Sequence, residues 1–471
     1  MTFLKTKWKL LVIILLSVLT LSFMASTIVV CCQNNKLATE LETEKNKQTD
    51  TYDFYLTLGT MPTLYATLNA YTNKNPNTYM WFLRGNTISK QYSADYIHYF
   101  NSQSTTNANS AFDYMEIRNK VREIYTNNNK AKFNLYCDDA RVRFIFDIFV
   151  SAGVDFEDLN VTLLSDGTGS YNIYANLTED AYTAQAGQWK NYMDTYLANR
   201  NDPEFTMFEN FNGQALEMDK FIFYTSTFSN VKYWIQHPDF LVNTKSATLN
   251  KNRYAMNIVK KDPKAMYNSL DDATRDAYQK VVLANALVDS DTLQTLDDAK
   301  AYFDNKLGNR DKDVVLILGN RNYGLEHNKN FVDQTLQFYT PTVDSADNTQ
   351  VKFKGKTYTI IAGDTTLVVD GKTYTIGEVS VYLFFKGHPS FPANNDLRAY
   401  FDSHNIEILP HRTPVETLFW MYNTKVGGYN STSFLSCDQG QAEFFYGELT
   451  GAVKQMQDLG FYDGAVTFTE G

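Results

Sequence analysis

A histidine that directly follows an apolar run is the first residue of this sequence that could do chemistry. His388 stands in the stretch FFKGHPSFP (Phe384–Pro392), in front of Pro389, and the chain has only six histidines. An imidazole titrates near neutral pH, so it can protonate or hydrogen-bond a departing phosphate. Lys386 adds a cation at the same predicted strand end. The alternative at such a position is a structural histidine that is packed and hydrogen-bonded.

A carboxylate occupies a comparable place in the first half of the chain. Asp166 follows an apolar run in LLSDGTGSY (Leu163–Tyr171) and precedes a glycine. At a strand end it can take a proton from a substrate hydroxyl when desolvation adjusts its pKa. Asp-Gly is also a common turn pair, so the motif has a structural interpretation as well.

Hydroxyl groups and a glutamate are the other candidate groups. In KVGGYNSTSFLSC, Ser431 and Thr432 are predicted to cap a helix whose first N–H groups bind an anion. In RTPVETLFW, Thr413, Pro414 and Glu416 fit the N-cap, N1 and N3 positions of a capping box. From such a helix start Glu416 could also reach the hydroxyls of a ribose.

Strands must alternate with helices to position these groups. The predicted strands cover residues 53–60, 79–85, 132–139, 159–167, 220–226, 313–320, 379–387 and 406–410. The predicted helices between them cover 62–75, 111–127, 140–152, 181–198, 270–288, 296–307 and 394–405. Continuous apolar strands indicate parallel sheets that are buried on both faces. Because the pattern occurs twice, we predict an α/β protein with two Rossmann-like domains facing across a cleft, and ligands beyond the carboxyl ends of the strands.

A short repeat interrupts the second half. KGKTYTI (Lys354–Ile360) recurs as DGKTYTI (Asp370–Ile376). Alternating threonine, tyrosine and isoleucine beside glycine turns predict a small antiparallel β insertion. We interpret this insertion, residues 351–377, as a surface addition outside the candidate site.

Composition excludes some classes of partner and site. The chain of 471 residues carries a net charge of −10, which argues against a nucleic-acid partner. Its 32 tyrosines and 32 phenylalanines suit carbohydrate contacts and a large core equally well. Cys137 and Cys437 are isolated, without CxxC spacing, so the sequence predicts neither a disulfide framework nor a zinc site.

The N-terminus predicts a membrane anchor or signal segment over residues 1–32. Three lysines precede an uncharged apolar run from Leu10 to Cys32, which is long enough for a bilayer-spanning helix of about 20 residues. The lysines favour an N-terminus inside and a body on the outer side of the membrane. Lipidation at Cys31 is an alternative, although Val30 is larger than the residue that usually precedes a cleavage site. Residues 33–51 are polar and predict a tether.

Together the motifs resemble the bacterial sialyltransferases of glycosyltransferase family 80. The resemblance rests on the Asp-Gly pair after a strand of the first half, KGHP after a strand of the second half, and the hydroxyl pair after VGG. YLTLGTMPTLYATLNAY (Tyr55–Tyr71) also resembles the family's first strand and helix, and LILGNRNYG (Leu316–Gly324) its glycine-containing donor loop. The resemblance extends over about residues 52–460.

The resemblance implies a glycosyltransferase-B (GT-B) fold. Residues 52–220 would form the acceptor domain, and residues 221–450 the domain that binds a CMP-sugar donor. Residues 451–471 would pack back on the first domain. The implied reaction is an inverting transfer of sialic acid from CMP-sialic acid to a galactoside-type glycan hydroxyl, without a metal ion or another cofactor.

The resemblance also implies a role for each candidate residue. Asp166 would be the general base on the acceptor hydroxyl, and His388 would stabilise or protonate the departing phosphate. The other implied contacts are with the donor and the acceptor: Ser431 and Thr432 to the phosphate, Glu416 to the ribose, Lys386 and Gly319 along the nucleotide, and Arg141 to the acceptor. No residue is implied as a metal ligand.

Three acceptor-side positions depart from the family's pattern. Ser165 and Ser170 stand where the family usually has acidic residues, and Arg141 stands where it usually has a histidine. The departures concern the acceptor rather than the donor. Two alternatives stay open: a non-catalytic surface lipoprotein that binds a sugar or solute, and an enzyme of the same fold that uses another nucleotide sugar.

Overall fold

The structure is a computed structural model of the chain. It describes residues 50–83, 87–100, 114–202, 205, 220–289, 292–308, 310–319, 324–388, 393 and 395–469, together with Ser22, Val30, Gln33 and Lys36. The predicted anchor and most of the predicted tether lie outside these residues. No helix in the described part of the chain is both long and apolar enough to cross a membrane.

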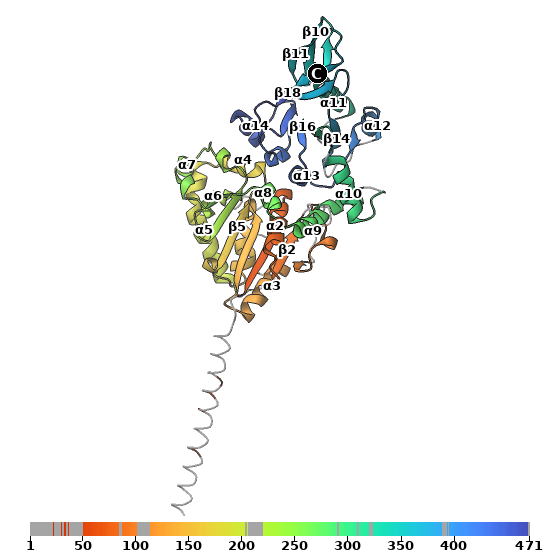
Figure 1. The fold of residues 1–471 in the computed structure, drawn as a ribbon. Helices are drawn as coiled ribbons and strands as arrows, with labels where there is room; N and C mark the ends of the chain where they lie inside the picture. Colours follow the sequence, from red (N-terminus) through yellow and green to blue (C-terminus); the bar gives the residue numbers. More distant parts are fainter. Residues whose placement is uncertain are drawn as a thin grey trace, which may run out of the picture. The chain divides into compact units, whose positions relative to one another are not determined.

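A sheet of seven parallel strands forms the first half of the protein (Figure 1). Its order is β3-β2-β1-β4-β5-β6-β7, and every neighbouring pair is parallel. The strands are β1 (Thr51–Thr57), β2 (Thr78–Phe82), β3 (Ile97–Tyr99), β4 (Lys132–Asp138), β5 (Leu159–Leu164), β6 (Val231–Ile235) and β7 (Ile258–Lys260). Both faces are buried, which explains why the central strands have continuous apolar sequences.

Six more parallel strands form a second sheet, in the order β15-β14-β8-β16-β17-β18. They are β8 (Val314–Leu318), β14 (Tyr382–Lys386), β15 (Glu407–Ile408), β16 (Lys425–Tyr429), β17 (Ala442–Tyr446) and β18 (Val466–Phe468). Both sheets belong to one compact unit, Thr51–Glu123 with Lys132–Gly471. The predicted α/β class with parallel sheets is confirmed.

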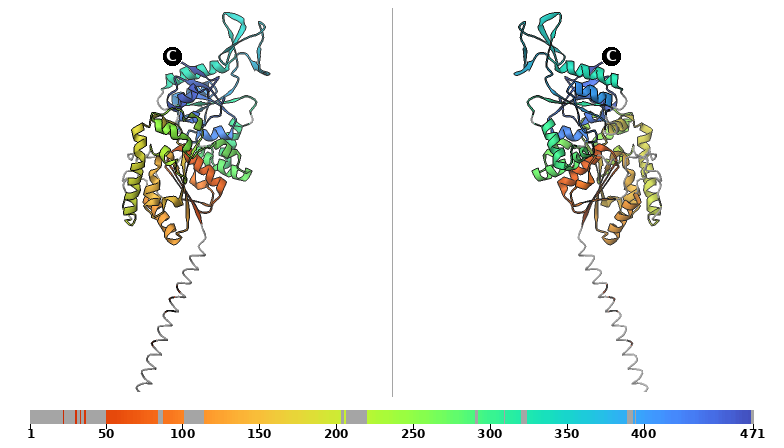
Figure 2. Two further views of the ribbon diagram at one scale, coloured as in Figure 1. Left: turned by 90° about the vertical axis from the view of Figure 1, so that its left-hand side faces the viewer. Right: turned by 90° about the vertical axis from the view of Figure 1, so that its right-hand side faces the viewer.

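Helices pack on both faces of the first sheet, as the side views show (Figure 2). Phe54 of β1 meets Phe149 of the π-helix η3 (Ile145–Val150), whereas the neighbouring Tyr55 accepts a hydrogen bond from Asn69 of α2 (Thr60–Asn73). Successive strand residues point to opposite faces, so η3 and α2 cover opposite sides. Helix α2 is buried from Pro62 to Tyr71.

The remaining α-helices connect the strands or extend from them. They are α3 (Tyr114–Asn127), α4 (Thr168–Asn176), α5 (Glu179–Asn199), α6 (Ile222–Thr225), α7 (Ala247–Asn252), α8 (Pro263–Asn268), α9 (Asp272–Leu283), α10 (Leu296–Leu307), α11 (Leu325–Tyr339), α12 (Asn395–Ser403), α13 (Val415–Met421) and α14 (Gly451–Asp458). Two short 3₁₀ helices, η2 (Asp139–Arg141) and η9 (Thr432–Ser436), matter for the site.

One predicted strand is wrong. Residues 220–226 have the aromatic, β-branched composition of a strand but form α6, because Phe221, Ile222 and Phe223 are all buried in this conformation. Tertiary packing has overridden a local propensity. The chain then adds β6 and β7 to the first sheet, so this sheet continues past the predicted boundary at residue 220.

The last residues contact both halves of the compact unit. Helix α14 packs on α4, and Gln455 donates a hydrogen bond to the carbonyl of Phe240 at 2.9 Å. The chain then returns to the second sheet as β18. This segment therefore joins the two sheets.

The repeated stretches form two β-hairpins between α11 and β14. Strands β9 (Thr342–Asp344), β10 (Asp347–Phe353) and β11 (Lys356–Thr359) make one sheet, and β12 (Thr366–Val369) with β13 (Lys372–Thr375) makes another. Lys354-Gly355 and Asp370-Gly371 both have positive φ values, as two-residue hairpin turns of type I′ require. Val351, Phe353 and Leu367 form a small core of their own.

Candidate active site

Four neighbouring strands of the first sheet end in polar residues. Strands β1, β4, β5 and β6 lie side by side, and Gly59, Asp138, Asp166 and His237 stand at or just beyond their ends. Parallel strands present their carboxyl ends at one edge of the sheet, where ligands of such sheets bind. This edge therefore places Asp166 among groups that were not predicted as site residues.

Asp166 lies directly against Gly59. A Cβ atom on Gly59 would lie 2.1 Å from Oδ1 and 2.5 Å from Cγ of Asp166, so only glycine leaves room for this carboxylate. Asp138 accepts hydrogen bonds from the backbone N–H groups of Leu58 at 2.7 Å and Gly59 at 2.8 Å. The exposed carboxylate and the buried one thus contact the same glycine.

Two buried carboxyl groups after β4 retain protons near neutral pH. Burial and the charge of Asp166 raise the pKa of Asp138 to about 8, although the two backbone donors and Arg141 favour the ionised form. Burial likewise raises the pKa of Asp139 to about 7, against the hydrogen bonds from Ser170 and Tyr233. Desolvation penalises the charged form of both groups. Asp138 therefore holds its proton to a higher pH than an ordinary aspartate does.

A chain of hydrogen bonds connects the loop of Asp166 to Asp139. Asp139 Oδ2 accepts from Tyr233 OH at 2.8 Å and from Ser170 Oγ at 2.5 Å. Ser165 Oγ lies 2.8 Å from Ser170 Oγ, and since Ser170 has one hydroxyl proton, Ser165 donates to it when Asp139 is ionised. Of the two serines that depart from the acidic pattern of the resembled family, Ser170 is thus bonded directly to Asp139, which follows β4, and Ser165 is linked to it through Ser170.

The second sheet supplies His388 and the hydroxyl pair from nearby strands. Strands β14, β8 and β16 are neighbours in the sheet. His388 is exposed just beyond β14, while Ser431 and Thr432 follow β16. Ser431 caps the 3₁₀ helix η9 and accepts a hydrogen bond from the N–H of Ser433 at 3.3 Å. A helix does begin at the hydroxyl pair, as predicted, but it is a short 3₁₀ helix.

Lys386 lies buried behind His388. It is 3% exposed, and its Nζ donates to the carbonyls of Gly387 at 3.0 Å and His411 at 2.7 Å. Burial lowers the pKa of Lys386 to about 8, against the charges of Glu416 and Asp289. The ammonium group therefore holds the backbone immediately before His388.

The predicted capping box at α13 is wrong. The helix begins at Val415, and Pro414 caps it without a side-chain hydrogen bond. Thr413 Oγ1 is buried and has no hydrogen-bond partner. Glu416 Oε1 accepts from Ser433 Oγ at 2.7 Å instead. A tertiary hydrogen bond thus takes the carboxylate away from the helix start and links α13 to the segment that carries the hydroxyl pair.

Gly319 lies just beyond β8 of the second sheet, and Arg141 lies just beyond β4 of the first. The N–H of Gly319 donates to the carbonyl of Lys386 at 3.0 Å, and a Cβ atom on it would lie 2.4 Å from the ring of Phe385. Gly319 therefore has a packing requirement at the end of β8. Arg141 is half-buried, donates to the carbonyl of Ala140 at 3.1 Å, and lies close enough to Asp138 to affect its pKa. Donor-loop residues 320–323 and Pro389 lie outside the described residues.

Helix η9 brings the two edges together. A Cβ atom on Gly167, next to Asp166, would lie 3.9 Å from Thr432 Cβ and 3.8 Å from Leu435 Cδ1. His237 Nε2 lies 2.8 Å from the carbonyl of Leu435 and donates to it. Segment η9, which begins at the hydroxyl pair, therefore packs beside the loop that carries Asp166.

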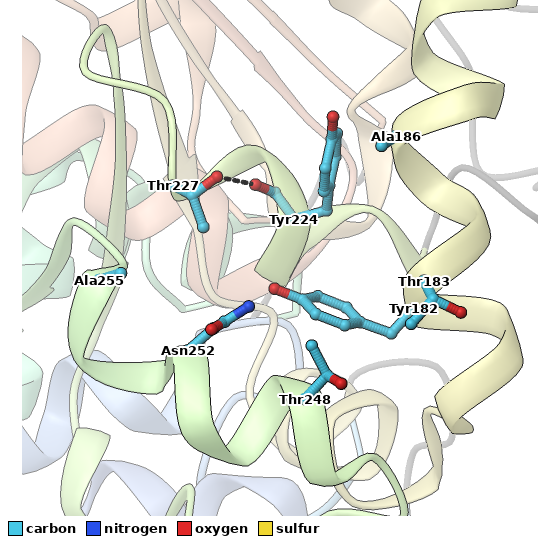
Figure 3. A pocket seen from close by; sticks show the side chains of 8 residues that line it. All are labelled: Tyr182, Thr183, Ala186, Tyr224, Thr227, Thr248, Asn252 and Ala255. Carbon is cyan, nitrogen blue, oxygen red and sulfur yellow. Dashed lines mark hydrogen bonds between the residues drawn. The ribbon is translucent and has the colours of Figure 1, made fainter.

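A separate hollow of about 380 Å³ lies away from these strand ends (Figure 3). It lies between α5, α6 and α7 and is lined by Tyr182, Thr183, Ala186, Tyr224, Thr227, Thr248, Asn252 and Ala255. Several of its hydroxyl groups already donate inside the protein: Thr227 to the carbonyl of Tyr224, and Thr248 to Glu179. We therefore assign the chemistry to the strand ends.

The sequence analysis gave no role to four residues of this edge, Gly59, Asp138, Asp139 and His237, although the first three stand at the ends of predicted strands. The pair of aspartates stands directly after a buried strand in LYCDD, which is a recognisable signal. Gly59 and His237 have no comparable signal, because their importance depends on which loops lie beside them. In the described part of the chain, no group of three or more His, Cys, Asp or Glu side chains is arranged to hold a metal ion.

Replacing Lys386 by methionine is expected to lower the free energy of unfolding by roughly 2 kcal/mol. The carbonyls of Gly387 and His411 would lose a buried donor, and an unsatisfied buried acceptor costs about 1–3 kcal/mol. Urea denaturation measures the change. Lys356→Met is the control, since Lys356 is exposed on a hairpin and surface changes usually stay within about 0.5 kcal/mol. Equal midpoints for the two variants would contradict the structural role of Lys386.

No protein-family model matches the sequence, and no curated protein matches it. Solved structures do match. The α/β-galactoside α-2,3-sialyltransferase of Photobacterium phosphoreum, a luminous marine bacterium, has a TM-score of 0.56 at 15% identity, over 89% of this chain and 99% of that one. A sialyltransferase from Photobacterium damsela has a TM-score of 0.56 at 12% identity, over 89% of this chain and 81% of that one. The GT-B domain of a Photobacterium damselae sialyltransferase has a TM-score of 0.55 at 13% identity, over 89% of this chain and 100% of that one.

These similarities establish the architecture. The three matching structures cover nearly all of the two-sheet body, and one of them is described as a GT-B domain. The resemblance inferred from the sequence motifs is confirmed at the level of the fold. With two parallel sheets and a site at their facing strand ends, this chain has the fold of the bacterial sialyltransferases of Photobacterium.

Proposed function

We propose that this protein transfers sialic acid from CMP-sialic acid to a hydroxyl of a galactoside-type glycan, with inversion and without a metal ion. The observation that supports it most is that η9, which begins at the hydroxyl pair, lies beside the Asp166 loop and contacts His237 of the same sheet edge through Leu435. A carboxylate that follows a strand of one sheet and a pair of hydroxyls that follows a strand of the other thus belong to neighbouring segments. Such an arrangement suits a reaction that removes a proton on one side and releases a phosphate on the other.

In the proposed reaction Asp166 takes the proton of the acceptor hydroxyl. The hydroxyl oxygen forms a bond to the anomeric carbon of sialic acid on the face opposite the phosphate. The bond between that carbon and the phosphate oxygen breaks, and its electron pair stays on the phosphate of CMP. One direct displacement of this kind inverts the configuration at the anomeric carbon.

The donor side stabilises the charge that develops on the phosphate. Ser431 and Thr432 would donate hydrogen bonds to it, and the exposed His388 would protonate it or donate a hydrogen bond. Glu416 would accept from the ribose hydroxyls while Ser433 orients its carboxylate. Lys386 would support this side from beneath by holding the backbone before His388.

The acceptor side and the membrane are further parts of the proposal. Arg141 lies at the end of β4 beside the carboxylates and would contact the glycan. The N-terminal segment, residues 1–32, would attach the protein to a membrane through a signal anchor or a lipid, with the catalytic body on the outer side.

The test uses the full-length protein in detergent with CMP-sialic acid, lactose and EDTA. CMP release and sialyllactose are followed together, for the wild type and for Asp166→Ala. We expect both products from the wild type and a loss of at least 100-fold in the variant, since general-base catalysis contributes about 10²–10⁴-fold. CMP release without sialyllactose would contradict the proposed galactoside-type acceptor. If a folded protein forms neither product, CMP-sialic acid is not the donor. That result would favour another nucleotide sugar or a binding role.

A further inference from the structure

We propose that Asp138 and Asp139 are positioning residues that hold the base Asp166 from two sides and thereby set the rate of transfer. The inference rests on the proposed function, and it concerns two residues that do not touch the substrate. Asp138 is 3% exposed and Asp139 is 1% exposed, whereas Asp166 is exposed. The two buried aspartates therefore act through their neighbours.

Asp138 fixes the surface on which the base lies. Both of its carboxylate oxygens accept from the turn between β1 and α2, through the N–H groups of Leu58 and Gly59. The carbonyl of Gly59 is held in turn by the N–H and the hydroxyl of Thr63, at 3.2 Å and 2.8 Å. With its N–H and its carbonyl both engaged, Gly59 forms a rigid wall against the Asp166 carboxylate.

Asp139 fixes the loop that carries the base. Ser165 and Ser170 bracket Asp166 in the chain, and both belong to the hydrogen-bond chain that ends on Asp139. Tyr233 of β6 donates to the same carboxylate oxygen. The loop is therefore tied to β4 and β6 at both ends of the short segment between the two serines.

The position of a base matters because it must lie within hydrogen-bond reach of the acceptor hydroxyl. A displacement of about 1 Å can cost about 100-fold in rate. Neither aspartate lies on the donor side, so the loss of either is expected to lower kcat and leave the donor KM unchanged. This split distinguishes positioning of the base from a general loss of the site.

Charge gives a second readout. Asp166 and Cys137 face both aspartates, Arg141 faces Asp138, and Tyr233 and Tyr171 face Asp139. Burial raises the pKa of Asp138 to about 8, so its charge appears beside Asp166 only as the pH passes through that value. We expect an inflection near pH 8 in the pH profile of kcat, and its absence in Asp138→Asn.

Stability supplies a readout that needs no activity. Between pH 4 and pH 8 the unfolded chain releases the Asp138 proton while the folded protein keeps it. The folded state then binds more protons, so the stability of the wild type falls relative to Asp138→Asn as the pH rises. Urea denaturation at pH 5, 6, 7 and 8 measures the difference between the two curves.

The experiment compares full-length wild type, Asp138→Asn, Asp139→Asn and Asp155→Asn in the lactose assay. Asp155 is exposed and its side chain caps nothing, so its variant should match the wild type. We expect kcat to fall 10- to 100-fold in the first two variants, with donor KM within twofold. Ser170→Ala removes the hydrogen bond between Asp139 and the loop, and its kcat should fall to the same extent. This variant replaces Asp139→Asn if that protein does not fold.

The outcomes separate the inference from the proposed function. A wild type without transfer would overturn the proposed function, and the pH dependence of stability would still test Asp138. Transfer by the wild type, with kcat within twofold in Asp138→Asn and Ser170→Ala, would overturn the inference alone. Parallel stability curves from pH 5 to pH 8 would overturn the raised pKa of Asp138, and the kcat of Asp138→Asn would then decide its positioning role.

Discussion

Gly59→Ala is expected to lower kcat for transfer at least 100-fold while the protein stays folded. Gly59 has φ −76° and ψ 159°, which alanine adopts without strain. The new Cβ atom would instead lie 2.1 Å from Oδ1 of Asp166. The Asp166 side chain is the part that can move, so the clash is relieved by displacing the carboxylate that we propose as the base. Steady-state kinetics with lactose as acceptor measure the loss.

The control is Gly187→Ala in α5. Its Cβ atom would meet nothing within 4 Å, and alanine is favoured over glycine in a helix by roughly 0.5–1 kcal/mol, so this variant should keep full activity. The double variant Gly59→Ala/Asp166→Ala should be no slower than Asp166→Ala alone, because the base is already lost. A Gly59→Ala enzyme with wild-type kcat would show either that Asp166 is not the base or that the backbone of the turn between β1 and α2 shifts to make room for the new methyl group.

His388→Ala is expected to lower kcat by about 100-fold or more, the range of general acid catalysis. The side chain is exposed just beyond β14, so its removal should leave the stability of the protein nearly unchanged. Because the imidazole would act on the departing phosphate, the loss should appear in kcat rather than in the acceptor KM. Exposure also predicts partial rescue of the variant by imidazole added to the buffer.

His98→Ala is the matched control, since His98 is exposed on β3 of the first sheet, where it approaches the carbonyl of Pro76 at 3.3 Å and lies against the ring of Tyr79. It should match the wild type in kcat and in imidazole response. A His388→Ala enzyme with normal kcat and a raised donor KM would assign His388 to ground-state binding of the donor. If kcat and the donor KM of His388→Ala both match the wild type, His388 has no role in the mechanism.

The motifs were readable from the sequence because each stands at a strand end. Apolar runs predicted β1, β4, β5, β8 and β14 close to their observed bounds, and Asp166 and His388 follow two of them. The period of a buried parallel strand is a local property of the sequence. The strands β3, β7 and β18 escaped prediction, since three residues carry too little pattern, and β6, β16 and β17 escaped it too, although each has five residues.

Local rules failed where a tertiary contact was stronger. The strand predicted at 220–226 became α6 because its aromatic residues are buried as a helix. The capping box at α13 did not form, since Glu416 bonds Ser433 of η9. In both cases the competing partner is distant in the sequence, so no local pattern could indicate it.

By itself, the sequence determined the α/β class, the parallel strands and the residue types available at their ends. Only the tertiary structure decided that the Asp166 carboxylate lies on Gly59, that Asp138 holds the same glycine, and that His237 contacts Leu435 of η9. The physical reason is the range of the interactions. Backbone periodicity is set by neighbours in the chain, whereas packing at a glycine and hydrogen bonds between loops depend on segments that meet only after both sheets have formed.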